Sequence, residues 1–152
     1  MKLYLLRHGH SPSLQEAGVT TDADRPLSAA GREAIRRAAR FLRDQGAHPQ
    51  VILTSPLRRA QESAEEAART LTPPQGVQPW VLLENRVSGK ELWKPLQSRA
   101  AGLAELLVVG HQPQLGELLL SLSGKDIAIA PGGLVALAVN PEKSSLLWVQ
   151  AP

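Results

Sequence analysis

The chain has 152 residues, of which 43% are hydrophobic and 20% charged, an ordinary composition for a globular protein with one substantial core. The absence of cysteine excludes disulfides, thiol nucleophiles and cysteine-ligated metal sites. No apolar stretch is long enough to span a bilayer and the N-terminal one is too short for a signal peptide, so we expect a soluble, cytoplasmic protein with a single domain, 1–152.

Predicted strands and helices alternate along the first half of the chain. The apolar run 3–6 predicts a buried strand that ends at Arg7-His8-Gly9, where the glycine permits a sharp turn. After a polar stretch, residues 28–46 predict a helix with a serine cap and a terminating glycine. Residues 51–54 predict a second strand, and 55–71 a second helix whose Ser-Pro start is typical of a cap followed by proline.

The second half continues this alternation. The pattern predicts a strand, a helix containing Pro95, a strand, a helix and two closing strands, over residues 77–83, 91–105, 106–109, 115–122, 134–139 and 146–149. Alternation of this kind is typical of an α/β protein. We therefore expect a three-layer α/β/α sandwich with a mostly parallel central sheet flanked by about four helices.

Basic and imidazole side chains follow three of the predicted strands. The first strand ends at Arg7-His8-Gly9, the second leads into 55–60 with its two arginines, and the fourth ends at Gly110-His111. The carboxyl ends of parallel strands meet at one edge of a sheet, and helix starts at Ser55 and Pro113 would add backbone donors there. No acidic cluster is evident nearby, so the sequence predicts an anion site suited to a phosphoryl group.

The overall charge is weaker evidence for the same conclusion. The formal net charge is +3, which favours anionic ligands. Most arginines, however, fall on what we expect to be one solvated helix face, as for Arg36, Arg37, Arg40 and Arg43.

Together these segments resemble the histidine phosphatase superfamily, the fold group of the phosphoglycerate mutases, over nearly the whole chain. Arg7-His8-Gly9 matches its defining tripeptide, 55–63 resembles its Ser-x-x-x-Arg-Ala-x-x-Thr segment with Ser63 in place of Thr, and Gly110-His111 resembles its second histidine. Residues 24–28, Asp-Arg-Pro-Leu-Ser, look like the small SixA-type phosphohistidine phosphatases. The chain has no room for the lid helices of larger branches, so the resemblance implies a phosphoglycerate mutase-like fold without a lid insertion.

The resemblance implies roles for particular side chains. His8 would be the nucleophile that forms a covalent phosphohistidine, provided that a backbone carbonyl binds its other ring nitrogen. Arg7, Arg59 and a protonated His111 would hold the phosphoryl oxygens, and Glu84 is the candidate general acid. Further candidates for contact with the phosphate are Arg25, Gly9 and Ser11. No metal or other cofactor is expected.

Two neighbouring residues are expected to play smaller parts. Arg58 lies one position before the family's arginine and is expected to face solvent. His10 is expected at the rim of the pocket or at the surface.

Other functional classes remain open or are excluded. A metal-dependent hydrolase could use His8, His10 and His111, although carboxylates at ligand spacing are lacking. A noncatalytic phosphate-binding module would need the arginines but not the nucleophile. A nucleotide-binding P-loop is excluded, because Gly124-Lys125 has Leu119 where the motif needs a glycine.

The expected partner is a phosphorylated substrate. We expect a protein phosphohistidine, carried by a signalling protein, and the alternative is a small sugar or nucleotide-related phosphate ester. No nucleic acid or membrane partner is expected. The sequence does not reveal the oligomeric state.

Overall fold

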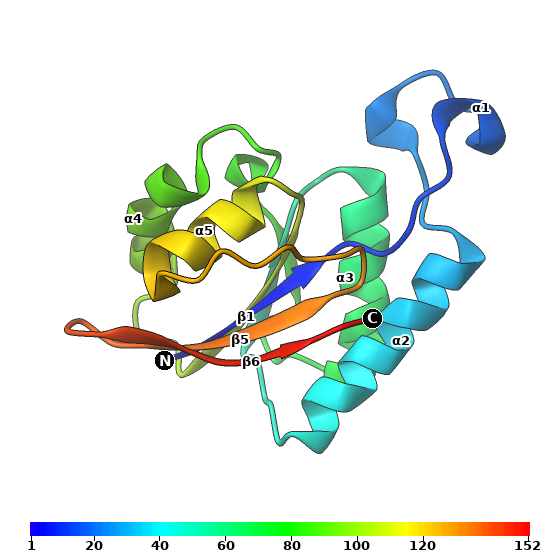
Figure 1. Ribbon diagram of the computed structural model, residues 1–152. Coiled ribbons are helices and arrows are strands. Elements are labelled where there is room, and N and C mark those ends of the chain that lie inside the picture. Colours follow the sequence, from blue (N-terminus) through cyan, green and yellow to red (C-terminus); the bar gives the residue numbers. More distant parts are fainter.

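The computed structural model describes residues 1–152 and has a central six-stranded sheet of order β3-β2-β4-β1-β5-β6 (Figure 1). The strands are β1 (Lys2–Arg7), β2 (Val51–Thr54), β3 (Val77–Pro79), β4 (Glu105–Gly110), β5 (Leu134–Val139) and β6 (Ser144–Gln150). Strand β4 pairs in parallel with β1 and β2, and β2 with β3. Strand β5 is antiparallel to both β1 and β6. The predicted α/β class with a mostly parallel sheet is confirmed.

Helices cover both faces of this sheet. They are α1 (Leu14–Ala17), α2 (Ala29–Asp44), α3 (Arg58–Leu71), α4 (Gly89–Arg99) and α5 (Gln114–Ser123), with 3₁₀ helices η1 (Asp22–Asp24) and η2 (Val81–Leu83). Figure 1 shows α2 and α3 on one side of the sheet and α4 and α5 on the other, while α1 lies in a loop that extends beyond the sheet edge. None of these helices has the length and apolar character needed to cross a membrane.

The apolar strands supply a core on each face of the sheet. Because successive strand residues point to opposite faces, Leu3 and Leu5 pack in the cluster with α4 and α5, whereas Tyr4 and Leu6 pack with α2 and α3. The three leucines among them are completely buried, with 0% exposure. Burial on both faces explains why this strand reads as a continuous apolar run rather than an alternating one.

Two predicted elements have different bounds in the structure. The strand expected over 77–83 is β3 followed by η2, because its partner β2 ends at Thr54 and the Trp80 N–H makes the last bond to it, to Thr54 O at 2.8 Å. The helix expected over 91–105 starts earlier, after the Ser88 cap, and tolerates Pro95 in its interior. It stops at Arg99 because the chain turns at Gly102, whose φ is +81°.

The start of the second predicted helix was wrong. Helix α3 begins at Arg58, and Leu57 occupies the cap position without a side-chain hydrogen bond. Ser55 does not cap, because its N–H still bonds Val109 O at 3.0 Å and so extends strand β2. Its Oγ instead accepts the Leu57 N–H at 3.2 Å. The polar stretch before α2 also contains α1 and η1, which the sequence pattern did not predict.

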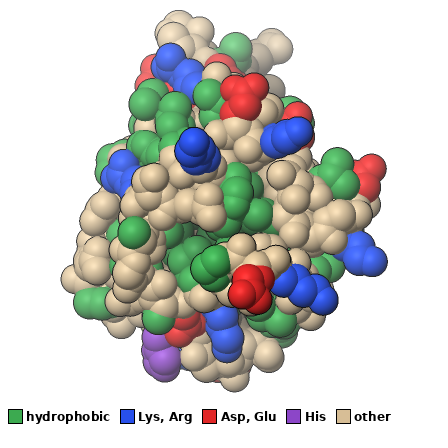
Figure 2. Space-filling view, turned by 90° about the vertical axis from the view of Figure 1, so that its left-hand side faces the viewer, with side chains coloured by type: hydrophobic (Ala, Val, Ile, Leu, Met, Phe, Trp, Pro, Cys, Tyr) green, Lys and Arg blue, Asp and Glu red, His purple; other side chains and the backbone are tan.

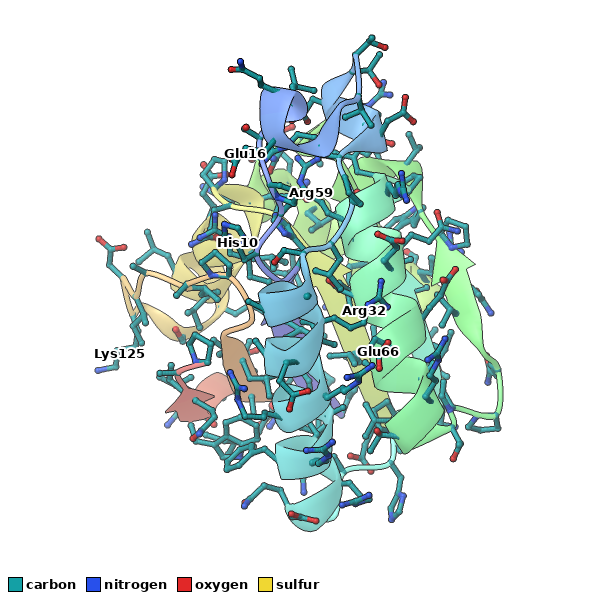
Figure 3. The ribbon with its side chains drawn as sticks, turned by 90° about the vertical axis from the view of Figure 1, so that its right-hand side faces the viewer. His10, Glu16, Arg32, Arg59, Glu66 and Lys125 are labelled. Carbon is teal, nitrogen blue, oxygen red and sulfur yellow. The ribbon has the colours of Figure 1, made fainter.

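Helices α2 and α3 are joined by an ion cluster, consisting of Arg32, Arg36, Glu66 and Arg69. The side chain of Glu66 on α3 is only 4% exposed and accepts hydrogen bonds from Arg36 Nε at 2.7 Å and Arg32 Nη1 at 2.9 Å. Arg69 Nη1 lies 3.7 Å from the same carboxylate. Figure 3 shows Arg32 and Glu66 directed toward each other between the two helices. Arg36 is therefore not simply solvated, as its helix face had suggested.

The sheet register brings the strand ends together. Arg7 is paired with Gly110 and Thr54 with Val109, so β1, β4 and β2 end at the same edge. The N–H of His8 continues the ladder to Gly110 O at 3.0 Å. The residues that follow these strands consequently meet around one point.

Candidate active site

A polar cavity of about 260 Å³ lies at this edge of the sheet. Its lining residues are Arg7, His8, His10, Ser11, Arg25, Arg59, Asn85, His111, Gln112 and Pro131. They come from the ends of β1 and β4, the start of α3, the loop that carries α1 and η1, and the loops after η2 and before β5. On the face over α4 and α5, by contrast, Figure 2 shows lysine and arginine side chains that are scattered rather than grouped.

The hydrogen bond of His8 defines the state of its ring. Nδ1 lies 2.7 Å from Gly9 O, and since a carbonyl can only accept, Nδ1 carries the proton and donates it. The other nitrogen, Nε2, therefore has a free lone pair when the ring is neutral. Burial lowers the pKa of His8 to about 4, with the charges of Arg59 and Arg7 acting in the same direction and the Gly9 hydrogen bond opposing them. His8 is thus neutral near pH 7.

His111 lies against His8, with ring centroids 4.9 Å apart. Its Nε2 is 2.7 Å from Ser55 Oγ, so the serine that does not cap α3 instead holds this ring. Burial, followed by the neighbouring His8 and Arg59, lowers the pKa of His111 to about 3. His111 is therefore neutral in the phosphate-free protein, because an imidazolium here would lose its hydration beside other basic groups. Its protonation with a phosphoryl group bound stays a prediction.

Arg59 enters the cavity and Arg58 does not. The Arg59 side chain is 10% exposed, with Nη1 donating to Asp22 O at 2.9 Å and Nη2 to Asp22 Oδ2 at 3.0 Å. The Arg58 side chain is 50% exposed and lies 3.6 Å from Glu62. Adjacent helix residues point about 100° apart, which explains why only one of the two faces the cavity.

Asp22 links two of the cavity arginines, and its contact with Arg59 was not predicted from the sequence. Its carboxylate bridges Arg59 and Arg25, the latter through Oδ1 at 3.0 Å from Nη1. Burial opposes ionisation, but the hydrogen bonds from the two arginines prevail and lower the pKa of Asp22. The expectation that nothing nearby cancels the positive charge is therefore wrong. The spacing of Asp22 three residues before Arg25 indicated the second contact, but only the fold brings Arg59 to it.

The other two arginines are held by backbone carbonyls. Arg7 Nη1 donates to Ile129 O at 2.9 Å, while its buried Nε has no hydrogen-bond partner. Burial lowers the pKa of Arg7. Arg25 donates from Nε to Pro12 O at 2.8 Å and from Nη2 to Ser11 O at 3.2 Å. Arg25 thus ties the loop together as well as lining the cavity.

Gly9 and Ser11 have other tasks than the expected contact with phosphate. The Gly9 N–H donates to Ser63 Oγ at 3.1 Å, and a Cβ on Gly9 would meet Gly31 O at 2.7 Å, so glycine permits close packing on α2. Ser11 lines the cavity, but its hydroxyl donates to Pro26 O at 2.6 Å. The Gly9 N–H and the Ser11 hydroxyl are thus used within the protein, and contact of these residues with phosphate stays a prediction.

Glu84 is not part of the cavity lining. Its carboxylate accepts from Arg86 Nη2 at 3.0 Å, and Asn85 lines the cavity in its place. Asn85 has a φ of +60° and is fixed by donating to Gln112 O at 3.2 Å and accepting from Gln114 N at 3.2 Å. No sequence pattern pointed to Asn85, because its position depends on contacts with the loop after β4 and the start of α5.

The metal-site alternative has no support in the arrangement of side chains. No group of three or more histidine and acidic side chains is placed to hold a metal ion, and His8, His10 and His111 do not form one.

A neutral histidine among arginines at the carboxyl edge of an α/β sheet forms a site suited to an anion such as a phosphoryl group. The sequence profile of the histidine phosphatase superfamily (branch 1) matches residues 3–90. The chain belongs to the histidine phosphatase superfamily, and its relatives support a phosphatase activity.

Relatives by sequence and by structure agree with this membership. The chain is 34% identical over 146 residues to an uncharacterised protein of Picosynechococcus sp. (strain PCC 7002), covering 90% of this chain and 84% of that protein. It is 30% identical over 125 residues to the phosphohistidine phosphatase SixA of Escherichia coli K12, covering 80% and 74%. The structure of the protein histidine phosphatase SixA complexed with tungstate matches with a TM-score of 0.89 at 23% identity, over 99% and 97% of the two chains. This last match shows the fold, which is phosphoglycerate mutase-like as expected.

Proposed function

We propose that this protein is a protein phosphohistidine phosphatase that works through a covalent phosphohistidine on His8. The observation that carries the proposal is the 2.7 Å hydrogen bond from His8 Nδ1 to Gly9 O. It leaves the lone pair of Nε2 as the nucleophile, in a cavity that arginines also line. The lowered pKa, about 4, keeps that lone pair free near pH 7.

The reaction proceeds in two displacements. In the first, His8 Nε2 forms a bond to phosphorus as the bond to the leaving group breaks. In the second, water attacks phosphorus, the P–N bond to His8 breaks, and inorganic phosphate leaves. Arg59 and Arg7 bind the phosphoryl oxygens through guanidinium N–H groups that the protein does not use.

His111 is proposed to change its charge when phosphate binds. Its pKa, about 3 in the phosphate-free protein, is low because of burial and neighbouring positive charge. A dianionic phosphoryl group would stabilise the imidazolium, so the pKa of His111 rises on binding. Proton uptake by His111 thereby strengthens binding as charge develops on the phosphoryl oxygens.

Phosphohistidine is a substrate whose cleavage needs no carboxylate acid in the cavity lining. The carboxylate nearest the expected acid position, Glu84, is paired with Arg86 outside the lining. An imidazole is a better leaving group than an alkoxide and depends less on a general acid. The E. coli relative that is 30% identical is a phosphohistidine phosphatase, which supports the same substrate class.

Replacement of His8 tests the mechanism. We expect His8→Ala to lose turnover and acid-labile phosphorylation of the protein, while tungstate binding measured by calorimetry persists because the arginines remain. His48→Ala is the matched control, since His48 is exposed and outside the cavity. Turnover that survives in His8→Ala would overturn the nucleophile. Tungstate binding without turnover by the wild type would identify a noncatalytic phosphate-binding module.

A substrate comparison tests the specificity. We expect a phosphohistidine-bearing protein to be hydrolysed with higher kcat/KM than any member of a panel of sugar and nucleotide phosphate esters. A strong preference for one ester would reject the protein-phosphatase assignment. Activity is expected to persist in EDTA, and its loss there with recovery on adding a metal ion would contradict the metal-independent mechanism.

A further inference from the structure

The cavity contains one histidine for which the mechanism has no task. Arginines do not release protons at neutral pH, His8 is the proposed nucleophile, and the Nε2 of His111 lies 2.7 Å from Ser55 Oγ. His10 also lines the cavity, yet neither the sequence motifs nor the reaction above use it. It follows the proposed nucleophile His8 by two residues and shares the cavity lining with His8 and Arg59.

The backbone of His10 is fixed against the start of α2. The Ser28 N–H donates to His10 O at 2.9 Å. Gly31 packs so closely that a Cβ there would lie 2.3 Å from His10 O and 2.8 Å from His10 N. Only glycine allows this approach, so the backbone that carries the imidazole has a defined position beside the cavity.

The ring of His10 is oriented by the same serine. His10 Nδ1 lies 2.9 Å from Ser28 Oγ, and that oxygen also accepts the Gly31 N–H at 2.9 Å. A hydroxyl oxygen has two lone pairs, so one can accept from Gly31 and the other from Nδ1–H of His10. When Nδ1 donates to Ser28, Nε2 is the nitrogen that exchanges a proton.

We propose that His10 is the catalytic acid of this cavity for substrates with an oxygen leaving group, an inference that rests on the proposed histidine phosphatase function. In the first displacement, the bond from His8 Nε2 to phosphorus forms, the P–O bond breaks, and Nε2–H of the His10 imidazolium protonates the departing oxygen. In the second, the attacking water gives a proton back to His10 Nε2 and its oxygen to phosphate, while the P–N bond to His8 breaks. Atoms and protons then balance over one turnover.

This role separates two substrate classes in one cavity. An alkoxide or phenoxide leaves slowly without a proton, whereas the imidazole of phosphohistidine leaves as a neutral ring when its other nitrogen is protonated. Hydrolysis of oxygen esters therefore depends on His10, and the first step on phosphohistidine does not. His10 takes the task that Glu84, bound to Arg86, cannot perform from outside the lining.

A leaving-group series tests this role. The quantity is kcat/KM, which reports the steps through release of the leaving group, for phenyl phosphate, p-nitrophenyl phosphate and a phosphohistidine peptide. His10→Asn places an amide nitrogen where Nδ1 lies, so that it can still bond Ser28, and removes the nitrogen that exchanges the proton. We expect kcat/KM to fall by about 100-fold or more on phenyl phosphate and by no more than about threefold on the other two substrates.

Further variants make the outcome decisive. His10→Gln, which places a non-titrating amide near the Nε2 position, is expected to show the same selective loss and replaces His10→Asn if that variant does not fold. His48→Asn is the control. An equal loss on all three substrates, or no loss on phenyl phosphate, overturns the role of His10. If the wild type forms no phosphoenzyme on His8, the proposed function itself fails, which the His10 variants would not reveal.

Discussion

Two groups of arginines in this protein differ in how their positive charge is compensated. In the α2–α3 ion cluster, Arg32 and Arg36 both donate to the 4% exposed carboxylate of Glu66, so the positive charge is matched inside the protein. In the cavity, the carboxylate of Asp22 contacts Arg59, whereas Arg7 is held by the backbone carbonyl of Ile129.

The comparison shows how charge distinguishes a structural from a functional cluster. A buried carboxylate surrounded by donors joins two helices and has no capacity left for a ligand. Arginines held mainly by neutral carbonyls, as Arg7 is by Ile129 O, keep their charge available. The cavity is therefore poised for an anion, and the ion cluster is not.

Among variants of the two arginine groups, the largest expected effect comes from replacing the planar guanidinium of Arg59. Arg59→Lys retains the charge but loses the planar pair of donors, and we expect kcat/KM on p-nitrophenyl phosphate to fall by about 100-fold. Arg58→Lys, at the 50% exposed neighbouring position, is the control. Equal kinetics for the two variants would show that charge alone suffices.

Breaking the ion cluster should affect stability and not catalysis. Glu66→Gln removes the carboxylate charge that Arg32 and Arg36 both contact, and we expect the free energy of unfolding to fall by about 2 kcal/mol. This loss is smaller than for a fully buried ion pair because both arginines are partly exposed to solvent. Urea denaturation measures this. The exposed Glu33→Gln should change it little. A large change in kcat/KM for Glu66→Gln would mean that the cluster also shapes the cavity.

Asp22 provides a further test of how the cavity arginines differ from those of the ion cluster, because it is the one acidic residue that joins cavity arginines. Asp22→Ala removes the bridge between Arg59 and Arg25, and we expect kcat/KM to fall by about tenfold as the guanidinium groups lose their orientation. Asp22→Asn keeps an acceptor oxygen and should lose only about threefold. An increase in kcat/KM for either variant would show instead that the carboxylate competes with phosphate.

The two regions should also differ in their response to acid. The folded-state pKa values of His8 and His111, about 4 and about 3, lie below the ordinary 6.5, so the unfolded chain binds more protons between these values. The free energy of unfolding therefore falls as the pH drops from 6.5 toward 4. Over this pH range we expect the free energy of unfolding of His111→Gln to fall by about 2 kcal/mol less than that of the wild type.

Glu66 provides the matched measurement at lower pH. Burial opposes ionisation, but the bonds from Arg36 and Arg32 prevail and lower its pKa below the ordinary 4.5. Its stabilising contribution is present above that value and is lost only as the pH falls further. A plot of the free energy of unfolding against pH should thus have the same slope for Glu66→Gln and the wild type between pH 6.5 and 5, and a different slope below pH 5.

For the histidines, the outcome that would contradict a buried neutral ring is a plot of the same slope for His111→Gln and the wild type between pH 6.5 and 4.

The sequence indicated the fold because strand and helix patterns are local. The apolar run 3–6 predicted β1, and the Ser28 cap predicted the start of α2. Predictions failed where a neighbouring element decided the outcome: Ser55 stays in the ladder with β4 instead of capping α3, and β3 stops early because its partner β2 ends at Thr54.

By itself the sequence also determined which residues meet at the sheet edge, because three strands of one direction must end together and place Arg7, His8 and His111 side by side. Only the tertiary structure decided how each group is used. Hydrogen-bond partners and burial are set by distant segments, such as Asp22 on Arg59 and Ser28 on His10. These contacts fix orientation and protonation, which depend on the surroundings of a side chain rather than on its identity.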